Sequence, residues 1–170
     1  GNIKKVEGDH DESLRYFRIG AEKYPKDSRI YQQMADVAMR SLDYEQATTY
    51  VNEGIEEVSE TDSLILLAYK ADLQIRASDL EGIKDTIKTM RDRNFRPDYI
   101  QWLEARVLLV QEKWYEAIQA LNDVRDRMVA FRDIHIQIDV YRGLCYEKLG
   151  QPEMALEAYN FALQSAPKND

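Results

Sequence analysis

The chain has 170 residues, of which 44% are hydrophobic and 32% are charged. This composition is typical of a folded protein with a core, and it excludes a disordered segment. The longest purely apolar run, Leu64–Ala68, is far shorter than the roughly 20 residues that a bilayer span needs. The net charge of -8 argues against the phosphate backbone of a nucleic acid as the main partner. We therefore expect neither membrane insertion of this segment nor a nucleic-acid partner.

The first residues indicate a piece of a longer protein. The chain begins with Gly1 and Asn2 instead of Met, and it starts partway through a repeat. We expect Gly1 to be a residue left after removal of an expression tag. No signal sequence is visible, which favours the cytoplasm. The single cysteine, Cys145, excludes an internal disulfide framework.

The predicted elements are all helices. In chain order, one helix near 9–24 is followed by four pairs of helices that end near 58, 93, 132 and 166. Apolar residues recur at i, i+3, i+4 and i+7 in these segments, the spacing of an amphipathic helix. Turn signals such as Gly150-Gln151-Pro152 separate the two helices of a pair, and Pro25, Pro97 and Pro167 mark the turns between pairs. The pattern predicts an all-α chain of about nine helices.

A pair of residues twelve positions apart repeats four times along the chain. The first member is always small, and a bulky apolar residue follows the second member four positions later. The pairs are Ala35/Ala47, Ala71/Ile83, Ala105/Ala117 and Gly143/Ala155. The chain opens with an incomplete copy that lacks the first helix, in which Ser13 is the second member and Phe17 is the bulky residue. Counted from Ser13, the second members recur at intervals of 34, 36, 34 and 38 residues. This period is typical of a helical solenoid, in which two antiparallel helices approach closely at small residues.

The last repeat carries the clearest family pattern. It has Gly143 and Tyr146 in the first helix, Gly150 in the turn, and then Ala155, Tyr159, Ala162 and Pro167. The chain thereby resembles the tetratricopeptide repeat family. The resemblance implies one right-handed superhelical solenoid over residues 1–170. Its expected parts are a half repeat at 2–26 and repeats at 28–61, 62–96, 97–133 and 134–167.

Residues that could carry out catalysis or bind a metal are not grouped in this sequence. Neither His10 nor His135 has a Cys or carboxylate at a spacing that would place it on the same helical face. Glycine-rich phosphate loops, nucleophile elbows and His-Glu-x-x-His motifs are also absent from the sequence. We therefore expect no enzyme activity, no metal and no cofactor in this segment.

The resemblance implies that the first helix of each pair lines a groove that binds a peptide or a protein. When the first helices are aligned by their small residues, aromatic, aliphatic and charged residues fall on the face that lines the groove. The expected partner-binding residues are Tyr99, Trp102, Arg106, Leu109, Val140, Leu144, Asp72 and Arg76. Tyr, Trp and Arg are the residue types that dominate the energetics of interfaces.

Three alternatives stay open at this stage. The first is that Trp102 is buried against a neighbouring element and is not exposed in the groove. The second is self-association into a homo-oligomer, because a solenoid exposes apolar faces at its ends. The third is RNA recognition, because residues 90–99 (MRDRNFRPDY) are similar to the close of a pentatricopeptide repeat. The acidic charge makes the third the least favoured.

Overall fold

The computed structural model describes the backbone of residues 2–166 and the side chains of residues 10–166. Gly1 and Pro167 lie outside these residues. Within the described part the chain forms nine α-helices and one 3-10 turn, with no strand. The helices are α1 (Asn2–Lys23), α2 (Ser28–Arg40), α3 (Tyr44–Glu57), α4 (Glu60–Arg76), α5 (Leu80–Asp92), α6 (Pro97–Val110), α7 (Trp114–Arg125), α8 (Arg132–Lys148) and α9 (Pro152–Ser165). The predicted all-α class and the number of helices are confirmed.

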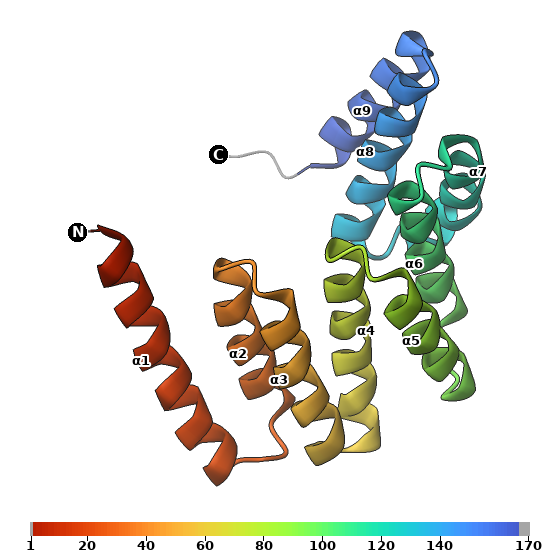
Figure 1. Cartoon of the computed structure of the whole chain (residues 1–170). Coiled ribbons are helices and arrows are strands. Elements are labelled where there is room, and N and C mark those ends of the chain that lie inside the picture. Colours follow the sequence, from red (N-terminus) through yellow and green to blue (C-terminus); the bar gives the residue numbers. More distant parts are fainter. Residues whose placement is uncertain (1, 167–170) are drawn as a thin grey trace. The chain divides into compact units, whose positions relative to one another are not determined.

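The chain divides into two compact units, Gly1–Asp92 and Arg93–Asp170. Unit 1 holds α1 and the hairpins α2–α3 and α4–α5, and unit 2 holds the hairpins α6–α7 and α8–α9 (Figure 1). The predicted helix of the region 113–132 ends at Arg125, and the 3-10 turn Asp126–Met128 follows it. This turn lies in the longest of the repeat intervals, where the sequence has extra residues. The four repeat boundaries and the single solenoid remain predictions.

Small residues lie at the predicted contact in three of the hairpins, whereas α4–α5 pairs Ala71 with the larger, buried Ile83. Ala35, Ala47, Ala105 and Ala117 have no exposed surface, and Ala155 is 3% exposed. In α8, a Cβ atom at Gly143 would lie 2.4 Å from the Tyr159 ring, so that position accepts only glycine. The twelve-residue spacing therefore marks the points where the paired helices touch, as the sequence predicts.

The turn inside every hairpin has the same backbone conformation. It contains one residue with positive φ, and these residues are Leu42 (56°), Ser78 (57°), Glu112 (57°) and Gly150 (71°). The next residue donates its backbone N–H to the carbonyl five positions earlier, as in Asp43 to Ala38 at 3.1 Å. This bond satisfies a carbonyl at the end of the first helix and reverses the chain. Only Gly150 pays no steric cost for the left-handed conformation.

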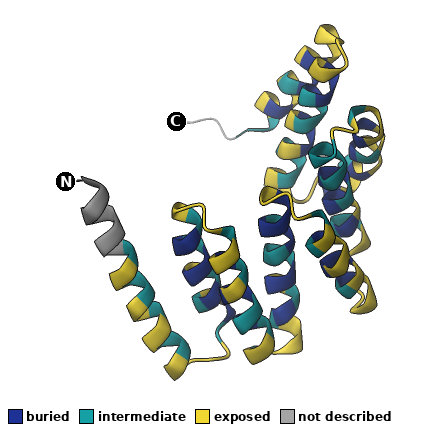
Figure 2. Cartoon of the chain, in the orientation of Figure 1, coloured by how far each residue is buried: buried dark blue, intermediate teal, exposed yellow. Residues whose placement is uncertain are grey.

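Each unit has its own apolar core (Figure 2). In unit 1 the core includes Tyr31, Met34, Val51, Leu66 and Leu73. In unit 2 it includes Trp102, Leu121, Met128, Ile138 and Cys145. In unit 1, the side chains of Asp27, Asp43 and Ser59 cap the N-termini of α2, α3 and α4. In unit 2, α6 and α9 begin with Pro97 and Pro152 at their first positions.

Replacement of Gly150 by alanine tests the turn geometry. We expect Gly150→Ala to lower the free energy of unfolding by about 1 kcal/mol, because a Cβ atom is strained at positive φ. The control is Gly20→Ala in the last turn of α1, where the nearest side-chain atom would lie at 3.5 Å. That substitution should raise stability by up to about 1 kcal/mol, since alanine favours a helix. Urea unfolding measures both, and effects of equal sign would contradict the assigned turn.

Candidate functional site

Trp102 is part of the core of unit 2 and is not an exposed anchor. Its side chain is 2% exposed, and its ring stacks on Tyr141 with centroids 5.7 Å apart and planes inclined by 25°. Tyr141 comes from α8, the first helix of the next hairpin. The expectation that Trp102 presents an exposed indole to a partner is therefore wrong. The alternative of a buried Trp102 is the one that the structure has.

The other expected residues of α6 are also largely covered. Arg106 is 8% exposed, and its guanidinium lies 5.6 Å from the centre of the Trp102 ring. Tyr99 is half-buried and meets Phe95 edge-on at 5.5 Å. Leu109 packs against the core of unit 2. Arg106 is therefore mostly enclosed by its own unit.

The two expected residues of α8 differ from one another in exposure. Val140 is 40% exposed, whereas Leu144 is half-buried. The six residues expected on α6 and α8 thus contribute one clearly exposed apolar side chain to the surface of unit 2. They do not form the broad apolar surface that the sequence predicts.

In unit 1, a tyrosine connects the first helices of two successive hairpins. The hydroxyl of Tyr69 in α4 donates to the carboxylate of Asp36 in α2. Burial, and then the hydrogen bond to Asp36, raise the pKa of Tyr69, so the phenol stays protonated. On the same stripe of α4, Arg76 Nε and Asp72 Oδ2 form an ion pair at 2.6 Å. The expected residues Asp72 and Arg76 thus lie beside the Tyr69–Asp36 contact.

Sequence reasoning missed Tyr69 and Tyr141, although a signal was present. Each tyrosine lies two positions before the small residue of its helix, Ala71 or Gly143. In both units this tyrosine contacts the first helix of the preceding hairpin, by a hydrogen bond in unit 1 and by ring stacking in unit 2. The equivalent positions therefore connect neighbouring hairpins.

An open hollow in unit 1 is formed by the end of the α1–α2 connection and the first turns of α2 and α4. It has a volume of about 750 Å³ and is lined by Tyr24, Pro25, Lys26, Asp27, Ser28, Arg29, Asp62 and Ile65. Tyr24 and Ile65 are 57% and 52% exposed, so the hollow offers apolar surface to a partner. Arg29 pairs with Asp27 at 2.7 Å. Among the described residues, the Lys26 ammonium has no ion-pair partner. Pockets of this size, mostly apolar with a few polar groups, are the usual form of a binding site.

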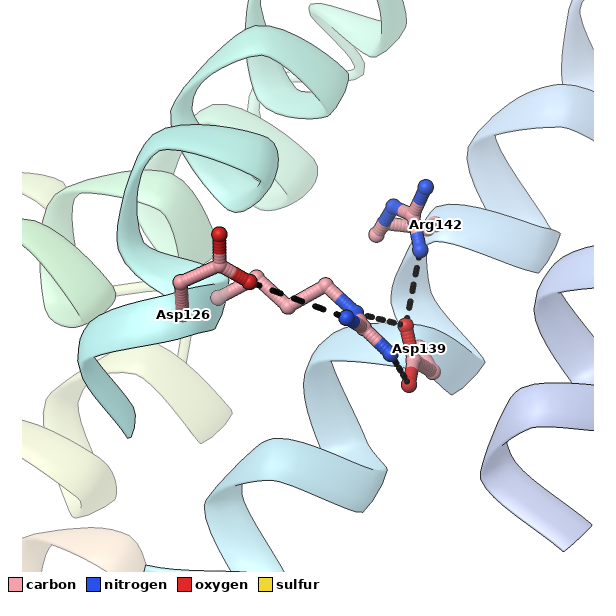
Figure 3. Close-up of polar contacts among 4 residues, drawn as sticks. Asp126, Asp139 and Arg142 are labelled. Atoms are coloured by element: carbon pink, nitrogen blue, oxygen red, sulfur yellow. Dashed lines mark hydrogen bonds and ion pairs between the residues drawn. The ribbon is translucent and has the colours of Figure 1, made fainter. Parts of the chain in front are cut away.

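The polar cluster of unit 2 is a structural clamp (Figure 3). Asp139 of α8 is fully buried and accepts two hydrogen bonds from Arg125 of α7, at 2.7 and 2.9 Å. Arg142 donates a third at 2.8 Å. Burial by itself would raise the pKa of Asp139, but the two arginines outweigh it and the pKa is lowered. The cluster joins α7 to α8 and leaves no carboxylate oxygen for a ligand.

The described part of the chain contains little other reactive chemistry. Burial raises the pKa of the Cys145 thiol to about 11, so the thiolate that would act as a nucleophile is scarce. Within residues 10–166, whose side chains the structure describes, no group of three or more His, Cys, Asp or Glu residues could hold a metal ion. The same residues include no helix that is both long and apolar enough to cross a membrane.

Comparison with known families gives a match over one repeat. Residues 140–169 match the model of the tetratricopeptide repeat family. A relative from Aquifex aeolicus (strain VF5), described as an uncharacterized protein, is 26% identical over 140 residues. The match covers 76% of this chain but only 18% of that relative, so the chain spans less than a fifth of its length.

Solved structures extend the likeness to nearly the whole chain. A crystal structure of MamA has a TM-score of 0.61 at 16% identity, covering 97% of this chain and 93% of that one. YrrB, described as a TPR protein with an unusual peptide-binding site, has a TM-score of 0.55 at 14% identity, covering 99% and 84%. A STAND protein from Pyrococcus horikoshii with a tetratricopeptide repeat sensor has a TM-score of 0.66 at 16% identity, covering 91% and 25%.

The chain has the tetratricopeptide fold. Its clearest tetratricopeptide repeat is the hairpin α8–α9, where Gly143 accommodates the Tyr159 ring and Ala155 and Ala162 are buried. Tyr159 also donates to Glu147 at 2.8 Å, which joins the two helices near the turn. The family resemblance that the sequence indicates is thus confirmed on the repeat that carries the strongest motif.

Removal of Trp102 should unfold unit 2 and not merely change its surface. We expect Trp102→Ala to cost about 3–5 kcal/mol, because it leaves a cavity beside Tyr141. A Trp114→Phe background isolates the Trp102 fluorescence, which should resist quenching by iodide in the folded chain. A control, Tyr115→Ala, removes an aromatic ring that is 64% exposed and should leave the melting temperature almost unchanged. Ready quenching of Trp102 would contradict its burial.

The Asp139 clamp predicts a stability that depends on pH. We expect Asp139→Asn to destabilise the chain by about 3–5 kcal/mol at neutral pH, since it leaves arginine charges without their buried partner. Because the folded pKa of Asp139 is lowered, its contribution is present above its unfolded value of 3.8 and disappears as pH falls below it. Unfolding of wild type and variant from neutral pH to acid should therefore converge. Asp126→Asn, at a carboxylate whose side chain is 92% exposed, is the control and should have little effect at any pH.

Proposed function

We propose that the chain is a non-catalytic module that binds a protein or peptide along the first helices of its hairpins. Proteins with the tetratricopeptide fold act as protein-interaction scaffolds, which supports the class of function. Of the residues predicted from the sequence, Arg76 and Val140 are exposed in this structure, and Asp72, Tyr99, Leu109 and Leu144 are half-buried and accessible in part. Trp102 and Arg106 are buried, so in this proposal they support the surface and do not contact the partner.

The hollow of unit 1 is the observation that carries the proposal. Ile65 in the hollow begins a stripe that continues along α4 through Tyr69, Asp72 and Arg76 at helical spacing. Asp36 of α2 lies across from Tyr69. A bound segment would place an aliphatic or aromatic side chain between Tyr24 and Ile65 and its polar groups along the stripe. Such an arrangement combines an apolar anchor with polar contacts that fix orientation.

RNA is the less favoured alternative. The family match of residues 140–169 is to tetratricopeptide repeats, and the chain has a net charge of -8. Single-stranded RNA is usually held by basic grooves with aromatic stacking platforms. The ring of Trp102 is buried and cannot serve as such a platform.

Selection of peptides from a displayed random library tests the proposed surface. We expect the enriched peptides to share an aliphatic or aromatic residue and to bind Ile65→Glu at least about tenfold more weakly, because a carboxylate would enter an apolar contact. The control variant, Val129→Glu, alters a residue of unit 2 that is 61% exposed and lies outside the proposed surface, so it should bind the same peptides normally. Calorimetry measures the affinities. Equal binding to both variants would place the site elsewhere, and failure to enrich any peptide would contradict peptide binding itself.

A further inference from the structure

The ion pair at the start of α2 has a counterpart at the start of α6. In α2, Asp27 is the N-cap residue, and Arg29 donates to its carboxylate from Nε at 2.9 Å and from Nη2 at 2.7 Å. In α6 the charges are exchanged. Arg96 is the N-cap residue, and its guanidinium donates to the carboxylate of Asp98 at 3.2 and 2.6 Å. Each unit therefore has a two-point pair of guanidinium and carboxylate at the same place in a hairpin.

In unit 2 an aromatic ring covers this ion pair. Phe131 is the N-cap residue of α8, the first helix of the next hairpin, and the Arg96 guanidinium lies 4.0 Å from the centre of its ring. A guanidinium that is paired with a carboxylate at its edge still has a flat face, and aromatic rings stack on that face. The ring thus lies between the starts of two successive first helices.

In unit 1 a serine stands in the position of this phenylalanine. Ser59 is the N-cap residue of α4, and its hydroxyl contacts only its own helix, where it donates to the Asp62 carboxylate and accepts from the Asp62 backbone N–H. The side chain of Arg29 is 83% exposed. Arg29 and Asp62 both line the open hollow. The hollow therefore lies where unit 2 has its aromatic ring.

The hollow also has apolar walls at positions that are polar in unit 2. Tyr24 and Ile65 line it and are both more than half exposed. When positions are counted from the N-cap residues, their equivalents in unit 2 are Arg93 and Gln137. The walls belong to α2, α4 and the α1–α2 connection, which have further helices before and after them in the sequence. Unit 1 thus has an apolar surround for a ring that its own sequence does not supply.

We propose that the hollow takes an aromatic side chain of the bound peptide, whose ring stacks on the guanidinium of Arg29 as Phe131 stacks on Arg96. This inference rests on the proposed function, because it specifies which kind of residue enters the hollow. An aliphatic side chain also fits between Tyr24 and Ile65, but it lacks the electron-rich face that attracts a guanidinium. Arg29 therefore makes the hollow prefer phenylalanine, tyrosine or tryptophan to leucine or isoleucine.

The peptide selection that tests the proposed surface also tests this preference. We expect peptides enriched on the wild-type chain to share an aromatic residue at one position. Peptides enriched on Arg29→Gln should carry aromatic and aliphatic residues there alike. Enrichment of aliphatic residues on the wild-type chain would overturn this inference, while peptide binding itself would stand. Failure to enrich any peptide would overturn both the proposed function and this inference.

A change in the peptide measures the contribution of the stacked ring. In one enriched peptide, cyclohexylalanine replaces the aromatic residue, which keeps the size of the side chain and removes its aromatic face. We expect this peptide to bind the wild-type chain about two- to fivefold more weakly by calorimetry, the range of an exposed cation–π contact, and both peptides to bind Arg29→Gln equally. Arg127→Gln, at an exposed arginine of unit 2, is the control and should keep the wild-type preference. Equal binding of both peptides to the wild-type chain would contradict the stacking.

A ring supplied by the chain itself tests the location. Ser59→Phe places a ring at the position that Phe131 has in unit 2, so it should fill the hollow and weaken peptide binding by about tenfold or more. The matched control, Ser59→Ala, loses the same capping hydroxyl but leaves the hollow open, so it should bind like the wild-type chain. Melting curves check that both variants are folded. Equal peptide binding by the two variants would overturn the assignment of the hollow.

Discussion

The close approach of two antiparallel helices at small residues is the constraint on which three of the hairpins depend; in α4–α5 the second member of the pair is Ile83. At Ala35/Ala47 and at Ala105/Ala117 neither side chain extends beyond a methyl group, and all four are fully buried. At Gly143 even a methyl group would clash with Tyr159. Because the backbones meet there, the large residues one turn away can fill the space on both sides. Turn geometry and core composition follow from this contact.

Neighbouring hairpins are joined by contacts of a different kind. Tyr69 and Tyr141 occupy the same register, yet one makes a hydrogen bond to Asp36 and the other stacks on Trp102. Between α7 and α8 the connection is ionic, through Arg125 and the buried Asp139. A buried ion pair contributes little net stability but is costly to break, so it favours one register of packing over others. The contacts within a hairpin are thus similar from repeat to repeat, whereas the contacts between neighbouring hairpins differ.

These connections also decide which surfaces remain for partners. In unit 2 the aromatic residues of α6 are used to hold α8, which removes Trp102 and Arg106 from the accessible surface. In unit 1 the polar contact between α2 and α4 leaves Ile65 and Tyr24 exposed around the hollow. The apolar surface that we propose for a peptide therefore lies in the first unit.

The sequence by itself determined the helices, their pairing and the turns between them. These features depend on local spacing: the twelve-residue pairs, the apolar period and the glycine at position 150 are all short-range signals. Only the tertiary structure decided that Trp102 is buried. Its partner Tyr141 lies far along the chain, and an aromatic residue on a helix face has the same local pattern whether a partner or a neighbouring hairpin covers it. Asp139 was missed for the same reason, because a single acidic residue becomes a clamp only when Arg125 from another helix reaches it.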